Sequence, residues 1–143
     1  MGIPKHLGDI LFIEDNPGDV RFTKEMLKEG EYRGTFHVVS DGAKALDFLQ
    51  RRGEYDDAPR PDIVLLDVHL PRMNGNEVVK AVKRTDELDD IPVVLLTGSL
   101  KESKDLEADV PEADAYIRKP IGPDEFTEAV RSCGEAETLD DAE

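Results

Sequence analysis

The residues of this chain that could do chemistry are three carboxylates, one hydroxyl and one ammonium, each placed at the end of a short apolar run. They are Glu14, Asp15, Asp67, Thr97 and Lys119. Carboxylates gathered in one place repel, since two charges about 4 Å apart interact by roughly 4 kcal/mol at an effective dielectric constant of 20. Either their pKa values rise or a cation lies among them, and Mg²⁺ suits such oxygen ligands. A hydroxyl and a lysine suit a phosphate or similar oxyanion. The set predicts phosphoryl transfer onto Asp67 as an acyl phosphate.

Each of these residues also has a simpler explanation. Glu14 and Asp15 fit the acidic start of a helix. Thr97 fits a strand-end cap, and Lys119 fits a solvated loop cation. Their joint occurrence at strand ends favours one common site, because ligands of open α/β sheets bind beyond the carboxyl ends of the strands.

The segment that ends at Asp67 shows how such a strand is recognised. Residues 63–66 are apolar without a polar break, which is typical of a strand buried on both faces of a parallel sheet. Pro71 and Gly75 follow too soon for a long helix. A carboxylate that closes a buried strand is costly unless the protein uses it.

Short apolar strands alternate with amphipathic helices five times along the chain. We expect strands at 9–13, 36–39, 63–66, 91–97 and 113–117, and helices at 19–29, after Ser40 or Asp41, from Gly75 to near Thr85, at 99–108 and at 124–133. Parallel crossovers are right-handed and helical, so this pattern predicts an α/β fold, a doubly wound five-stranded parallel sheet with five helices. We expect an N-terminal arm at 1–8, one domain at 9–133, and a disordered acidic tail at 134–143.

Composition narrows the function classes. The chain has 33 acidic and 18 basic residues, a formal net charge of −15, which argues against nucleic acid or an anionic membrane as direct partners. No run approaches the roughly 18 apolar residues that a membrane span needs. The single cysteine, Cys133, excludes an internal disulfide and suits a reducing cytoplasm. Either a high-salt cytoplasm or an ordinary acidic domain explains the charge, and we favour high salt.

Several short stretches, in this order and spacing, carry a family likeness across almost the whole chain. They are residues 13–15 (IED), 66–67 (LD), 70–75 (LPRMNG), 96–98 (LTG) and 116–120 (YIRKP). In these stretches the chain resembles the receiver domains of two-component response regulators. The resemblance implies the CheY-like, flavodoxin-like strand order 2-1-3-4-5. Residue 14, a glutamate here, is more often an aspartate in the family.

The resemblance also implies roles for the acidic residues. Asp67 would accept a phosphoryl group from a histidine kinase or a phosphotransfer protein. Mg²⁺, or Mn²⁺ in its place, would be held directly by Asp15, Asp67 and the backbone carbonyl of His69, and through water by Glu14. His69 has no second histidine at metal-ligand spacing, so we expect its backbone rather than its side chain to bind the ion.

Further roles follow from the same resemblance. Thr97 and Lys119 would bind phosphoryl oxygens, and Tyr116 would be the aromatic residue that turns inward when Thr97 moves. The peptide bond between Lys119 and Pro120 is commonly cis in such domains. His69 and Ser99 would set the lifetime of the phosphoryl group. Without the resemblance, Tyr116 is merely a strand aromatic with a solvated hydroxyl.

The output is expected to be contact with a downstream protein, as in stand-alone receivers similar to small phytochrome-associated response regulators. The chain would then catalyse only its own phosphorylation and dephosphorylation. The sequence does not decide whether it forms a homodimer. Two alternatives remain. One is a phosphatase with Asp67 as nucleophile, although such enzymes usually carry a second aspartate where this chain has His69. The other is an adaptor that phosphorylation does not affect.

Overall fold

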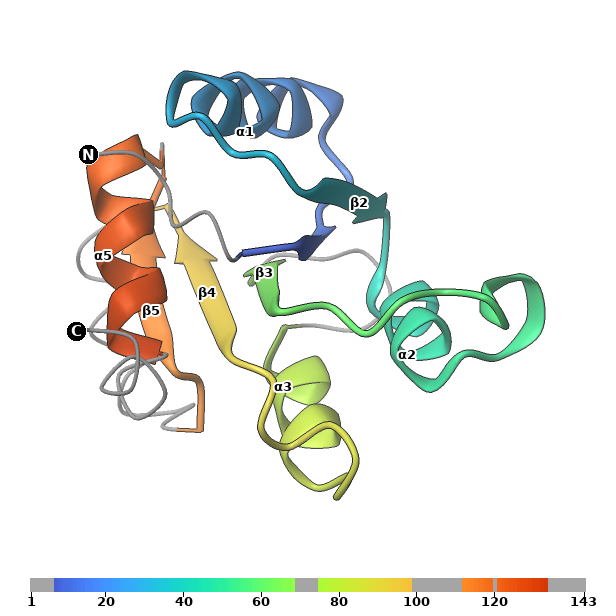
Figure 1. Ribbon diagram of the computed structural model, residues 1–143. Helices are drawn as coiled ribbons and strands as arrows, with labels where there is room; N and C mark the ends of the chain where they lie inside the picture. Colours follow the sequence, from blue (N-terminus) through green and yellow to red (C-terminus); the bar gives the residue numbers. More distant parts are fainter. Residues whose placement is uncertain (1–6, 69–74, 99–111, 120, 134–143) are drawn as a thin grey trace, which may run out of the picture.

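The computed structural model describes residues 7–68, 75–98, 112–119 and 121–133. Five parallel strands form one sheet in the order β2-β1-β3-β4-β5, which confirms the predicted fold and strand order (Figure 1). The strands are β1 (Asp9–Ile13), β2 (Thr35–Val39), β3 (Ile63–Asp67), β4 (Val93–Thr97) and β5 (Ala115–Arg118).

Helices cover both faces of this sheet (Figure 1). They are α1 (Pro17–Glu29), α2 (Gly42–Gln50), α3 (Gly75–Lys83) and α5 (Pro123–Cys133), with one short 3-10 turn, η1 (Gly53–Tyr55). Buried residues of α1 and α5 pack on one face of the sheet, and those of α2 and α3 pack on the other. The fifth predicted helix, at 99–108, lies outside the described residues.

The two central strands explain the unbroken apolar runs in the sequence. Every residue of β3 and β4 is buried. Along β3, Val64 and Leu66 join the core beneath α2 and α3, while Ile63 and Leu65 join the core beneath α1 and α5. Because successive side chains of a strand point to opposite faces, both sets must be apolar.

The start of α1 differs from the prediction by two residues. The helix begins at Pro17, because Asn16 caps it: the Asn16 Oδ1 accepts hydrogen bonds from the amides of Gly18 and Asp19 at 2.8 and 3.2 Å. Proline suits the first helical position, where its missing N–H is not needed. This cap places Asp19 in the first turn of α1, which faces the carboxyl edge of the sheet.

The starts of β4 and β5 are also later than predicted. Strand β5 begins at Ala115 because the residue before it, Asp114, bends the chain instead. The Asp114 carboxylate accepts hydrogen bonds from the Val93 amide and the Lys83 ammonium, both at 2.8 Å. Strand β4 begins after Pro92, a residue without a backbone donor.

The predicted N-terminal arm is partly packed. Leu7 is buried in the core beneath α1 and α5, and the Gly8 carbonyl accepts a hydrogen bond from the Thr35 amide at 3.0 Å. Residues 1–6 and the predicted acidic tail lie outside the described residues, so the limits of arm and tail stay predictions. Among the residues that the structure describes, no helix has the length and apolar character to cross a bilayer.

The Tyr32 hydroxyl links the residue before β1 to the first residue of β2. It contacts the Gly8 carbonyl and, at 2.9 Å, the Thr35 carbonyl. Burial raises the pKa of Tyr32 above its ordinary value of 10.0, and the nearby carboxylates of Asp9 and Asp62 raise it further. The folded protein therefore favours the neutral phenol.

We predict that Tyr32→Phe lowers the free energy of unfolding by about 1 kcal/mol at neutral pH, since it removes the donor of a half-buried side chain from its carbonyl partners. The raised pKa means that the contribution of Tyr32 is fully present below pH 10 and is lost as the pH rises beyond it. The difference between the two proteins should therefore shrink in alkaline solution. Urea denaturation at a series of pH values checks this, and a difference independent of pH would contradict it.

Candidate functional site

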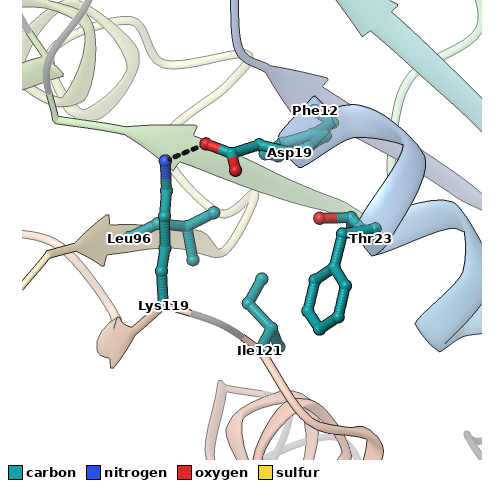
Figure 2. A pocket seen from close by; sticks show the side chains of 7 residues that line it. Phe12, Asp19, Thr23, Leu96, Lys119 and Ile121 are labelled. Atoms are coloured by element: carbon teal, nitrogen blue, oxygen red, sulfur yellow. Dashed lines mark hydrogen bonds and ion pairs between the residues drawn. The ribbon is translucent and has the colours of Figure 1, made fainter. Parts of the chain in front are cut away.

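The ammonium of Lys119 forms the centre of a charged cluster at the carboxyl edge of the sheet. Its Nζ donates to Glu14 Oε1 at 3.0 Å, Asp19 Oδ2 at 2.8 Å and Asp67 Oδ2 at 3.1 Å. Figure 2 shows the Lys119 side chain extended toward Asp19. A lysine ammonium has three N–H donors. Three carboxylates therefore use its whole donor capacity.

Four different elements bring these groups together. Asp67 is the last residue of β3, Glu14 directly follows β1, and Lys119 directly follows β5. Asp19 comes from the first turn of α1. Since β1, β3 and β5 are parallel, their carboxyl ends meet at one edge, as the sequence predicts for Glu14, Asp67 and Lys119.

Thr97 completes this edge from the fourth strand. It is the last residue of β4, and it is fully buried. Its backbone carbonyl accepts a hydrogen bond from the Lys119 amide at 2.8 Å. This bond fixes the backbone from which the Lys119 side chain extends.

Burial makes the cluster electrostatically tight. The side chains of Glu14 and Asp67 are 1% and 7% exposed, against 42% for Asp19. Burial raises the pKa of Glu14 to about 7, with Asp67 adding to the rise and Lys119 opposing it. Burial alone would lower the pKa of Lys119, but its bonds to the three carboxylates raise it above its ordinary value.

The other predicted site residues lie apart from this cluster or beyond the described part of the chain. Asp15 is exposed and is not among the carboxylates that surround Lys119. Tyr116 of β5 is half-buried and packs against the core beneath α2 and α3. His69, Ser99 and Pro120 lie outside the described residues. The predicted roles of all five stay predictions.

Asp19 is the site residue that sequence reasoning missed. The sequence places it only at the start of a helix, and its approach to Lys119 depends on the angle at which α1 leaves the sheet. The available signal was its place three residues after Asn16, in the first turn after the acidic pair Glu14 and Asp15. Asp19 also lines a pocket of about 210 Å³ with Phe12, Phe22, Thr23, Leu96, Lys119 and Ile121 (Figure 2).

The carboxylates suit a divalent cation. Glu14, Asp19 and Asp67 each offer an oxygen, and the three oxygens lie within 4.8 Å of one another. Carboxylate oxygens are ligands that Mg²⁺ prefers. One ammonium carries a single positive charge against three carboxylates, two of which are buried. The donor chemistry at this edge therefore fits the ion predicted from the sequence.

Comparison with known proteins identifies the same architecture elsewhere. Residues 10–131 match the family model of the response regulator receiver domain. The chain is 37% identical to response regulator Rcp1 of Synechocystis sp. over 110 residues. The aligned residues make up 77% of this chain and 75% of Rcp1. These relatives give the high-salt explanation of the charge no support.

Solved structures give the same result. The structure of the bacteriophytochrome response regulator AtBRR superposes with a TM-score of 0.83 at 38% identity, covering 90% of this chain and 94% of that one. The Mn²⁺-bound form of Rcp1 has a TM-score of 0.71 at 34% identity, covering 92% and 93%. Phosphorylated RcpA, a cyanobacterial phytochrome response regulator, has a TM-score of 0.72 at 32% identity, covering 90% and 92%.

We predict that Lys119→Gln lowers the free energy of unfolding by about 3–5 kcal/mol in buffer without divalent ions, because it leaves two buried carboxylates without their cation. Adding Mg²⁺ should restore part of the loss, since an ion that binds only the folded state stabilises it. Urea denaturation with and without MgCl₂ measures both effects.

Lys24→Gln is the matched control, because Lys24 is an exposed lysine of α1. Its replacement should leave stability within about 0.5 kcal/mol of the wild type. Equal losses in the two variants would show that the Lys119 ammonium does not compensate the carboxylates.

Proposed function

The chain belongs to the response regulator receiver family, and we propose that Asp67 is the residue on which it accepts a phosphoryl group. Receivers act in two-component phosphorelay signalling as phosphoacceptors rather than as conventional enzymes, which excludes the phosphatase alternative as the main activity. This chain is close to the phytochrome-associated members over most of its length. The observation that carries the assignment is the buried Asp67 carboxylate, held at the end of β3 by Lys119.

The transfer is a displacement at phosphorus. A carboxylate oxygen of Asp67 attacks the phosphorus of a phosphohistidine, the P–N bond breaks, and the imidazole nitrogen keeps the electron pair. The product is an acyl phosphate on Asp67. Lys119 stabilises the negative charge of the transferred group, and the Thr97 hydroxyl donates to one of its oxygens.

The cation is part of the same proposal. Mg²⁺ would be held by Asp15, Asp67 and the His69 carbonyl, with Glu14 acting through water. When bound, the ion neutralises charge on the phosphoryl oxygens. Support comes from the oxygen-rich set around Asp67 and from the Mn²⁺-bound form of the relative Rcp1.

The partners follow from the family. A sensor histidine kinase or a phosphotransfer protein supplies the phosphoryl group, and a protein target in the cytoplasm responds to it. Phosphorylation adds roughly two negative charges to an acidic edge. Thr97 and Tyr116 respond to this charge and alter the surface that the target binds.

We predict that the wild-type protein gains one phosphoryl group from acetyl phosphate in the presence of Mg²⁺, and that Asp67→Asn gains none. The amide of asparagine lacks the nucleophilic carboxylate that forms the acyl phosphate. EDTA should abolish the gain, because the transfer needs the ion. Intact-mass spectrometry measures the result.

Asp89→Asn is the matched control, an exposed aspartate in the segment between α3 and β4. It should be phosphorylated like the wild type. No phosphoryl gain by the wild type at any salt concentration would contradict the proposal. Equal gain in Asp67→Asn would place the modification on another residue.

A further inference from the structure

One of the three carboxylates that hold Lys119 has no role in the proposed transfer. Asp19 makes the shortest of the three contacts, 2.8 Å, against 3.0 Å for Glu14 and 3.1 Å for Asp67. Resting on the function proposed above, we propose that Asp19 is a positioning residue, which holds the Lys119 ammonium beside Asp67 while Glu14 and Asp67 are engaged by Mg²⁺.

The two other contacts of Lys119 are in competition with the metal. Glu14 and Asp67 are both proposed to serve the ion, and a divalent cation beside them repels an ammonium bound to the same carboxylates. Asp19 is outside that proposed ligand set. When the ion binds, Asp19 is therefore the described carboxylate that can still hold Lys119.

The start of α1 places the Asp19 carboxylate where it can hold Lys119. Its backbone amide is fixed by Asn16 Oδ1 at 3.2 Å, and the helix cap sets the direction of its side chain. The Asp19 side chain is 42% exposed, against 1% for Glu14, so its carboxylate loses less hydration in the folded protein. The carboxylate also lies in the first turn of α1, where the helix dipole favours negative charge.

Positioning matters because a lysine side chain is long and flexible. Its stem loses rotamer entropy when it is held in one place. Because the ion pair with Asp19 forms before the reaction, this entropy loss does not add to the barrier of the transfer. The ammonium then already lies where the phosphoryl oxygen will arrive. Without Asp19, the metal-bound site would release Lys119 toward solvent.

The competing explanation is that Asp19 is itself a metal ligand, since its oxygen lies within 4.8 Å of those of Glu14 and Asp67. The two explanations differ in what they predict for the affinity of the ion. A ligand contributes directly to Mg²⁺ binding. A positioning residue affects the transfer rate and leaves Mg²⁺ affinity nearly unchanged.

The test compares wild type, Asp19→Asn, Asp19→Glu and Asp124→Asn. Asp124→Asn is the matched control, because Asp124 is an exposed carboxylate in the first turn of α5 and lies outside the cluster. Three quantities are measured: the Mg²⁺ dissociation constant by calorimetry, the maximal rate of phosphorylation by acetyl phosphate at saturating Mg²⁺, and the ¹H–¹⁵N signal of the Lys119 ammonium with Mg²⁺ bound.

We expect Asp19→Asn to slow the maximal rate by about ten- to a hundredfold, the scale of a misplaced catalytic group. Its Mg²⁺ dissociation constant should stay within about twofold of wild type, which would correspond to roughly 0.4 kcal/mol. The Lys119 ammonium signal should broaden through faster solvent exchange. Asp19→Glu should recover most of the rate and the signal, and Asp124→Asn should match wild type in all three measurements.

A maximal rate in Asp19→Asn equal to that of the wild type would overturn the inference while leaving the proposed function intact. So would a loss of Mg²⁺ affinity in Asp19→Asn of tenfold or more, because Asp19 would then be a ligand. A wild type that is never phosphorylated would overturn the proposed function and this inference with it. If Asp19→Asn melts below the assay temperature, Asp19→Ser, which retains a residue suited to a helix start, replaces it with the same expectations.

Discussion

The site depends on one ammonium placed among three carboxylates. Lys119 contacts Glu14, Asp19 and Asp67 within 3.1 Å, and two of these three acids are almost fully buried. Burying a carboxylate without a partner is costly, so the folded chain requires this cation. One positive charge nevertheless faces three carboxylates, and burial together with the neighbouring Asp67 raises the pKa of Glu14 although Lys119 opposes the rise. A divalent cation would balance this excess of negative charge.

The sheet can concentrate this charge at one edge because its two central strands are apolar up to their last residues, Asp67 and Thr97. Strands β3 and β4 are buried along their whole length, and this packing fixes the positions of their last residues, Asp67 and Thr97. Gly75 then lets the start of α3 return close to β3, because a Cβ at this position would come within 3.1 Å of the Val68 Cα. The polar edge is thus a small part of the molecule, supported by two clusters of buried apolar side chains, one on each face of the sheet.

Much of the fold and of the site could be predicted from the sequence, for physical reasons that differ between residues. Asp67 and Thr97 were found because each closes an unbroken apolar run, and parallel strands bring such ends together. The strand order came from the family resemblance, because alternation alone does not distinguish the orders of a parallel sheet. Asp19 was missed, because a helical carboxylate reaches the edge only through the angle of its helix. The exposure of Asp15 was not predictable either, because Glu14 and Asp15 follow the end of β1 at Ile13, where strand alternation no longer decides which side chain turns inward.

The donor count of Lys119 explains why such a site would act as a switch. All three of its N–H groups are used by carboxylates, so a phosphoryl oxygen can bond to Lys119 only when one of them is released. Phosphorylation of Asp67 would convert that carboxylate into a mixed carboxylic–phosphoric anhydride whose carboxyl oxygens carry no charge, which makes its contact the weakest of the three. A phosphoryl oxygen on the same side chain would then replace it, while Asp19 keeps the ammonium in place. The exchange would require little movement of Lys119, and the larger change would be the added negative charge, which the neighbouring ends of β4 and β5 must accommodate.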